Sequence, residues 1–281
     1  MERGASTGTR TEADQGTLSA GIPHRAITER ILELAGQAGY EAALIDAVAG
    51  TVTAWPRFAW TIRAAAHGLS RRGLADGDTA AVFVQDAASF TIAVNVIRAA
   101  GGTALPIRSD TAVQDVAAQL NERGVRLLIA AAPLAEVAAE AADRSRVRQV
   151  FTFGEAAGTT SFHSLLSAGR HQADGQLAEV FGPADTAASA AAQDGLTALD
   201  GLACPGRAGL SHRDMVVAAP PCGDGQAYTS LLDLTLLAGA TIVAAPVAQV
   251  TAAVRVYRGT VAIVPTGTEV PGISPDRVFG I

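Results

Sequence analysis

The stretch VFVQDAASFTIAVNVIRAAGGTALPIRSDTAVQDVAAQLNERGVRLLIA, residues 82–130, decides the fold class of this chain. Short apolar runs alternate in it with longer segments whose apolar side chains recur every three or four residues. We expect buried strands at residues 79–84, 103–107 and 125–130. Strands separated by helices of this length are typical of βαβ units, so the stretch predicts a parallel sheet with helices packed on it.

The helices between these strands carry start and stop signals. Residues 89–100 form an apolar helix that is expected to end at Gly101-Gly102. In the next helix, Thr111 and Gln114 have the spacing of a capping box, and Gly124 stands where a C-terminal stop belongs.

The same pattern continues outside this stretch. Upstream we expect a helix at 26–36 and a pair of short strands at 43–46 and 52–54, and downstream a helix at 134–142 and a strand at 147–153. After residue 195 a weaker unit follows, with a helix from Ser211, a helix around 230–237, and strands at 241–245 and 260–264 that flank a helix at 250–257.

A short internal sequence repeat relates the two units. AAGGTALP at 99–106 is matched by LAGATIVAAP at 237–246, each at the end of an apolar helix. We therefore predict an α/β fold of two related βαβ subdomains with mostly parallel sheets. The predicted divisions are a disordered tail at 1–24, a first subdomain at 25–168, a linker at 169–194 and a truncated second subdomain at 195–281.

Composition excludes several kinds of chemistry. The chain has 281 residues and a formal net charge of -6, and all 21 residues counted as Lys or Arg are Arg. A chain without lysine cannot form a Schiff base, use a Ser-Lys dyad or place a lysine on a phosphate. Arginine does not replace lysine as a base, because its guanidinium stays protonated. A GC-rich genome would explain the composition, and the exclusion holds whatever its origin.

Charge and hydropathy also limit the partners. Nucleic acid needs a clustered basic face, but the arginines are scattered, and the run at 144–148 follows Asp143. No apolar run reaches membrane-spanning length, and the polar N-terminus lacks the apolar core of a secretory signal. Cys204 and Cys222 have no metal-ligand spacing. We expect a cytoplasmic protein with reduced thiols, no metal, and no nucleic-acid or membrane partner.

Further blocks accompany residues 82–130 in a fixed order: AAAHGLSRRGLADGD at 64–78, LSHRDMV at 210–216, LLAGATIV at 236–243 and TVAIVPT at 260–266. Together they resemble the N-terminal part of the adenylate-forming superfamily, which includes acyl-CoA synthetases, coumarate-type ligases and peptide-synthetase adenylation domains. The resemblance covers the chain from about residue 40 onward. It implies the N-terminal domain of such enzymes without the mobile C-terminal domain, which we expect to be absent.

The resemblance also implies a reaction and its cofactors. In such ligases a carboxylate attacks ATP to give an acyl-adenylate, and a thiol then takes the acyl group, with ATP, Mg and CoA as cofactors. The corresponding phosphate loop, ALDGLACPGR, keeps Pro205 but has Gly206 at the lysine position. Gly201 stands at a hydroxyl position, Asp200 would repel phosphate, and Arg207 would replace the lost charge only in a shifted register. We therefore expect no adenylation by this chain alone and no use of these cofactors.

The acyl pocket implied by the resemblance corresponds to residues 220–228. The family's His is missing there, and we expect Pro221, Gly223 and Tyr228 to bind the substrate. Under a different reaction, His212, Asp224 and Cys222 are the candidates for acid, base or nucleophile.

Simpler roles compete with the catalytic ones. His212-Arg213-Asp214 matches the start of a kinase catalytic loop, but Ala219 replaces the required Asn. Ser211 and Asp214 have capping-box spacing and indicate a helix start. The cysteines fit a buried apolar role, and Asp224 and Asp233, near the inferred pocket mouth, fit helix caps or solvated side chains.

Three functions remain open at this level. The first is a non-adenylating protein of a biosynthetic pathway that binds an acyl or aryl carboxylate or thioester, or acts as a scaffold. A mean hydropathy of +0.26 fits a homodimer or a partner protein covering its apolar surface. The second is a repurposed isomerase, cyclase or hydrolase that uses the old acyl pocket, and the third is a ligase half completed by a partner chain.

Overall fold

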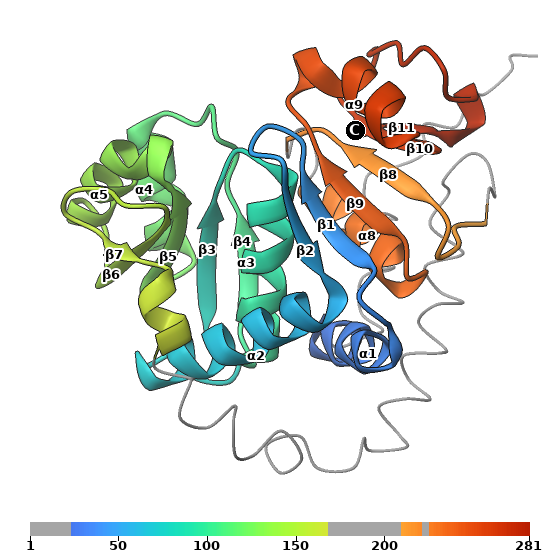
Figure 1. The fold of residues 1–281 in the computed structure, drawn as a ribbon. Helices are drawn as coiled ribbons and strands as arrows, with labels where there is room; N and C mark the ends of the chain where they lie inside the picture. Colours follow the sequence, from blue (N-terminus) through green and yellow to red (C-terminus); the bar gives the residue numbers. More distant parts are fainter. Residues whose placement is uncertain (1–23, 168–208, 221–224) are drawn as a thin grey trace, which may run out of the picture.

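Two β-sheets form the framework of this protein in a computed structural model, which describes residues 24–167, 209–220 and 225–281 (Figure 1). The predicted tail up to residue 23, the predicted linker at 169–194 and the predicted phosphate loop at 200–207 lie outside the described residues.

The five-stranded sheet and its helices come from one continuous part of the chain: β3 (Thr79–Phe83), α3 (Ala87–Ala99), β4 (Thr103–Pro106), α4 (Val113–Glu122), β5 (Leu127–Ala131), α5 (Ala135–Asp143), β6 (Gln149–Phe153) and β7 (Thr160–Ser161). The strand order is β4-β3-β5-β6-β7, and all neighbours are parallel. The strands and helices expected between residues 79 and 153 are therefore confirmed.

The six-stranded sheet combines both ends of the described chain: α1 (His24–Gln37), β1 (Ala42–Asp46), β2 (Thr51–Ala54), α2 (Trp55–Arg71), β8 (Met215–Ala218), α8 (Gly225–Leu237), β9 (Thr241–Ala244), α9 (Val250–Tyr257), β10 (Val261–Val264) and β11 (Val278–Gly280). Its order is β11-β10-β8-β9-β1-β2, and only the β1–β2 pair is antiparallel.

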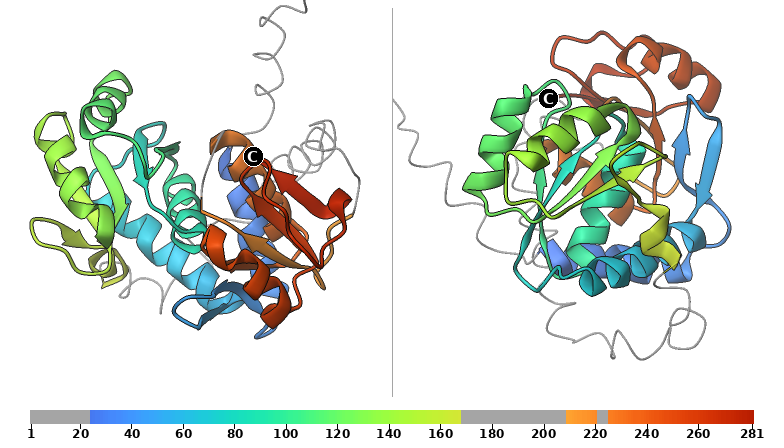
Figure 2. Two further views of the ribbon diagram at one scale, coloured as in Figure 1. Left: turned by 90° about the horizontal axis from the view of Figure 1, so that it is seen from above. Right: turned by 90° about the vertical axis from the view of Figure 1, so that its left-hand side faces the viewer.

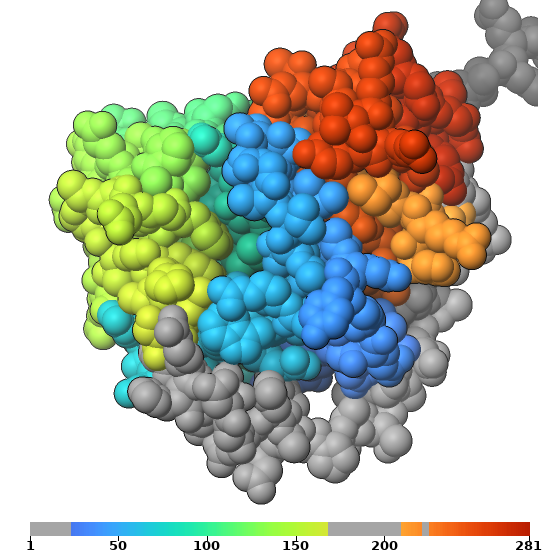
Figure 3. Space-filling view, in the orientation of Figure 1, coloured from blue at the N-terminus to red at the C-terminus, as the bar shows by residue number. Residues whose placement is uncertain are grey.

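The β1–β2 hairpin is where the predicted division of the chain differs from the sheets. The sequence places residues 43–54 with the first subdomain, but β1 pairs in parallel with β9, with Leu44 opposite Ile242. Figure 3 shows the hairpin, in blue, between the green and the red parts of the molecule. The boundary between the two halves is therefore not a simple cut in the sequence.

One central core lies between the sheets. It includes the buried Trp55 and Phe58 of α2, Phe90 of α3 and Tyr228 of α8, together with side chains of both sheets. Separate cores form where α4 and α5 cover the outer face of the five-stranded sheet and where α9 covers the outer face of the six-stranded sheet. Figure 2 shows the resulting layers from above.

The two halves repeat one another in detail. Both α3 and α8 have 13 residues, and the strands that follow them, β4 and β9, have 4 residues each. At the same place in both connections a glycine takes a left-handed backbone conformation, with φ of 86° at Gly101 and 72° at Gly239. The orders β4-β3-β5-β6 and β9-β8-β10-β11 are also equivalent. The expectation of two related βαβ subdomains with mostly parallel sheets is confirmed.

The capping box expected before α4 is wrong. The helix begins at Val113 with Ala112 as its N-cap, and no side chain caps it. The N–H of Thr111 is still bonded to the carbonyl of Arg108 in a preceding turn, at 3.1 Å. Because the turn uses Thr111, the helix begins one residue later than the spacing suggests.

Candidate functional site

The strand order points to one edge of each sheet. The chain passes from β8 through α8 to β9 on one side of β8, whereas β10 lies on its other side. In open α/β sheets, ligands bind beyond the carboxyl ends of the strands where the order reverses in this way. The carboxyl ends of β8 and β10 are therefore the first place to look for a site.

Tyr228 lies near this edge, but its side chain is in the core. It has no exposed surface, and its hydroxyl donates a hydrogen bond of 2.6 Å to the carbonyl of Ala219, just after β8. Its ring meets that of Phe90 edge to face, with centroids 5.2 Å apart. The predicted substrate-binding tyrosine therefore joins α8 to α3 and to the end of β8.

His212 lies at the other end of β8. It is exposed in the turn before the strand, and its Cβ would be 3.4 Å from a Cβ added at Gly239. The four residues of β8 span about 10 Å, so this histidine and Tyr228 are not brought together. The other predicted site residues, Asp200, Gly201, Pro205, Gly206, Arg207, Pro221, Cys222, Gly223 and Asp224, lie outside the described residues.

The helix expected from Ser211 is wrong, because a turn leads directly into β8. The backbone N–H and the hydroxyl of Ser211 both donate to Asp214 Oδ2, at 2.8 and 2.9 Å. The bond from the Ser211 N–H to the Asp214 side chain is one half of a capping box. The other half is absent, because the Asp214 N–H donates to the Ser211 carbonyl at 2.9 Å, which closes a turn instead. Its strand, β8, then pairs with β9 and β10.

Asp214 is held by three segments of the chain. Its Oδ1 accepts hydrogen bonds from Thr260 Oγ1 at 2.7 Å and from Arg277 Nη1 at 2.8 Å. Burial opposes ionisation of Asp214, but the hydrogen bonds from Thr260, Arg277 and Ser211 outweigh it and lower its pKa to about 2. Asp214 is thus a structural carboxylate that fixes the start of β8 to β10 and to the segment before β11.

The sequence predicts a helix cap or a solvated side chain at Asp233, and the structure shows neither. It is buried on α8, and Arg98 Nη1 of α3 donates to both of its carboxylate oxygens, at 3.0 and 2.8 Å. The two side chains are only 6% and 5% exposed. Burial raises the pKa of Asp233, and the charge and hydrogen bonds of Arg98 oppose that rise. No local pattern marks this pair, because its members are 135 residues apart in the chain.

A cavity of about 460 Å³ is lined by the segment that connects β10 to β11 and by residues of both strands. Val264 and Pro265 at the end of β10 and Gly280 at the end of β11 form part of its wall. Glu269 is its one charged lining residue, and the remaining walls are formed mainly by Val270, Pro271, Ile273, Pro275 and Val278. No sequence motif marks these residues, because they come from an irregular segment between two strands.

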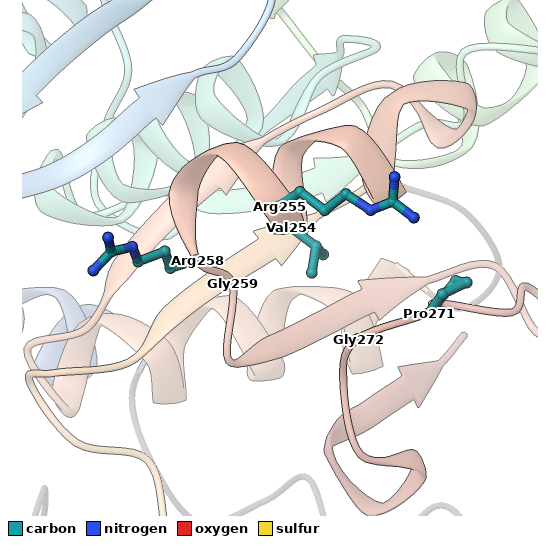
Figure 4. A pocket seen from close by; sticks show the side chains of 6 residues that line it. All are labelled: Val254, Arg255, Arg258, Gly259, Pro271 and Gly272. Carbon is teal, nitrogen blue, oxygen red and sulfur yellow. The ribbon is translucent and has the colours of Figure 1, made fainter.

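A second cavity, of about 340 Å³, lies beside α9. It is lined by Val254, Arg255, Arg258, Gly259, Pro271 and Gly272. Figure 4 shows that the side chains of Arg255 and Arg258 point in opposite directions, so their charges do not converge on one ligand.

Among the helices of residues 24–167, 209–220 and 225–281, none combines the length and the apolar character that a bilayer span requires. In the same part of the chain, no group of three or more His, Cys, Asp and Glu side chains is placed to hold a metal ion.

Comparisons with known proteins place this architecture. No protein-family profile and no curated protein sequence matches the chain. Among solved structures, it is similar to a long-chain-fatty-acid-CoA ligase from Archaeoglobus fulgidus, with 19% identity and a TM-score of 0.67 over 87% of this chain and 52% of that one. A benzoate CoA ligase from Burkholderia xenovorans gives 19% identity and a TM-score of 0.68 over 85% and 50%.

An isolated N-terminal domain is also similar. The inhibitor-bound N-terminal domain of FACL13 from Mycobacterium tuberculosis gives 17% identity and a TM-score of 0.65, over 85% of this chain and 63% of that one. This chain spans about half the length of the two ligases above. It therefore has the fold of the N-terminal domain of adenylate-forming acyl-CoA ligases.

Proposed function

We propose that this chain binds an acyl or aryl carboxylate, or its thioester, in the cavity formed by β10, β11 and the segment that connects them, and does not form adenylates by itself. The observation that carries this proposal is the cavity. Its volume of about 460 Å³ is within the range of small-molecule sites, and its walls are mostly apolar. Two of its lining residues, Val264 and Pro265, stand at the carboxyl end of β10, one of the two strands that flank the reversal of strand order.

The neighbouring structures support the same class of ligand. The fold is shared with ligases that act on long-chain fatty acids and benzoate. The N-terminal domain of FACL13 holds an inhibitor as an isolated domain. A part of this fold can therefore bind a small molecule without the remainder of a ligase, which is the situation we propose for this chain.

The proposal excludes adenylation for a chemical reason. Phosphoryl chemistry depends on cations and backbone donors placed around the phosphates. The chain has no lysine, and its ALDGLACPGR run has Asp200 and Gly206 where the resemblance implies phosphate contacts.

Binding can be tested with the purified chain. Isothermal titration with benzoate, a medium-chain fatty acid and their CoA thioesters should show saturable binding of at least one of them. Ile273→Asp, which puts a charge on the cavity wall, should weaken that binding at least tenfold. Val256→Asp is the matched control, because Val256 is 71% exposed on α9 and does not line this cavity.

Two results would contradict the proposal. Failure of every acyl and aryl compound to bind, or binding that Ile273→Asp leaves unchanged, would remove the site. Robust ATP–pyrophosphate exchange by the chain alone would remove the non-adenylating part.

A ligase half completed by a partner chain is the second candidate, because this chain spans about half the length of the ligases that it matches. ATP–pyrophosphate exchange that appears only after a partner chain is added would favour it. The mass of the purified protein in solution tests the proposed homodimer. The repurposed-enzyme hypothesis stays a prediction, because Cys222 and Asp224, two of its three candidate catalytic residues, lie outside the described residues.

A further inference from the structure

Helix α1 lies across the boundary between the two halves of the molecule. It packs on α2, on α3 of the five-stranded sheet and on α8 of the six-stranded sheet (Figure 1). Its inward face is apolar, with Ile31, Leu32 and Ala35 all at most 3% exposed. The helix is thus placed to hold α3 and α8 together, and anything that weakens its attachment acts on both halves.

The first turn of α1 touches the buried Arg98–Asp233 ion pair. Nδ1 of His24 lies 3.4 Å from Nη2 of Arg98, and Nη1 of the same guanidinium is bonded to Asp233. One turn further along α1, the buried Thr28 hydroxyl donates to Asn95 of α3 at 2.8 Å. Polar contacts therefore join α1 to the helix that carries Arg98.

The chemistry of this contact allows one protonation state of His24. A guanidinium can only donate hydrogen bonds, so Nδ1 must accept and must carry no proton. Protonation at Nδ1 would remove the acceptor and place a second cation against Arg98. We propose that the packing of α1 on α3 and α8 is sensitive to protons. Neutral His24 supports this packing, and protonation of His24 loosens α1 from α3 and α8.

The charged groups around His24 agree with this direction. Arg98 faces it from α3 and Asp233 from α8. Burial is the main cause that lowers the pKa of His24 from its ordinary value of 6.5, Arg98 lowers it further, and Asp233 opposes the change. A lowered pKa means that the folded state binds the proton less well than the unfolded state. The attachment is therefore complete above about pH 6.5 and weakens as the pH falls below it.

Other contacts hold α1 without His24. From α2, Arg63 Nη2 donates to the carbonyl of Leu32 at 3.3 Å. From the loop after α2, Asp76 lies 3.5 Å from Arg25 Nη1, and Arg25 also pairs with Glu29 of its own helix.

Hydrogen–deuterium exchange of the whole chain at pH 7.5 and pH 5.0 tests whether the attachment of α1 depends on pH. After correction for the intrinsic pH dependence of exchange, residues 24–37 should exchange several-fold faster at pH 5.0, whereas α4 on the outer face should not change. His24→Asn keeps an acceptor that does not titrate, and should abolish the pH-dependent difference. His24→Gln provides a second variant of the same kind in case the asparagine disturbs the helix.

The control is His163→Asn, which removes an exposed histidine on another part of the surface and should keep the wild-type response. Equal exchange of residues 24–37 at the two pH values in the wild type would overturn the proposal. So would a pH response that persists unchanged in both His24 variants. Because each comparison is made within one variant, a general loss of stability does not imitate the result.

Discussion

Phe90 and Tyr228 occupy equivalent positions in the two halves, each as the fourth residue of its 13-residue helix, and their rings meet edge to face at 5.2 Å. The repeat thus brings its own equivalent residues into contact. The tyrosine differs from the phenylalanine by one hydroxyl, and that hydroxyl binds the carbonyl of Ala219.

Tyr228→Phe tests the contribution of this hydroxyl. The substitution keeps the ring contact with Phe90 but leaves the buried Ala219 carbonyl without this donor, and we expect a loss of about 1–2 kcal/mol in unfolding free energy. Urea denaturation measures it. Tyr40→Phe is the control, because Tyr40 is 93% exposed, and it should change stability by less than about 0.5 kcal/mol. Equal effects of the two substitutions would show that the hydrogen bond is unimportant.

Arg98→Met leaves Asp233 as an unpaired buried carboxylate, and should cost about 3–5 kcal/mol in unfolding free energy. Adding Asp233→Leu removes that carboxylate as well, so the double variant should regain most of the loss. Arg108→Met is the control, since its ion pair with Asp110 is exposed and such pairs contribute about 0–1 kcal/mol. A double variant no more stable than Arg98→Met would contradict this account.

Asp214→Asn should make stability less dependent on acid. The pKa of Asp214 is about 2 in the folded chain and near 3.9 in the unfolded chain, so its carboxylate stabilises the fold above about pH 4. That contribution is lost as the pH falls toward 2. The variant should lose about 1–3 kcal/mol at pH 7, with a smaller further decrease than wild type between pH 5 and pH 2. Unfolding midpoints across this range measure the difference, and Asp143→Asn, at an exposed position, should follow wild type.

Gly68→Ala should destabilise a helix, against the usual preference for alanine. A Cβ at Gly68 would lie 2.5 Å from the carbonyl oxygen of Leu165, a backbone atom that cannot move aside easily. We expect a loss of about 1–3 kcal/mol in thermal or urea unfolding. Gly36→Ala, also within a helix, meets nothing within 4 Å and should be neutral or stabilising by up to about 1 kcal/mol. The prediction fails if both substitutions stabilise the chain.

Local pattern was sufficient for most strands and helices but not for their partners. The run at 79–84 is predicted as a strand because residues 80–84 are continuously apolar, as is typical of buried parallel strands. Nothing near Leu44 indicates that it pairs with Ile242, and nothing near Arg98 indicates a carboxylate 135 residues away. The Ser211–Asp214 spacing does not distinguish a tight turn from a helix start, because in both a side chain three residues on can accept a bond from the first backbone N–H.

The candidate site was harder to predict than the fold. The sequence places His212 and Tyr228 near one predicted pocket, because their separation of 16 positions does not show that a strand intervenes. That strand, β8, places the two residues at its opposite ends. The cavity walls come from residues such as Val270 and Ile273, whose apolar side chains are unremarkable in sequence. Their place follows only from the ends of β10 and β11.

The pairing of β1 with β9 has a consequence for synthesis of the chain. The pairing of Leu44 with Ile242 cannot form until Ile242 has been synthesised. At about 5–20 residues per second, synthesis of the intervening chain takes roughly 10–40 s. Meanwhile β3 to β7, which are contiguous, can assemble behind it. During this interval the hairpin has one apolar strand edge without its partner. The nascent chain is therefore most exposed to mispairing or chaperone capture at its earliest strands rather than at its latest.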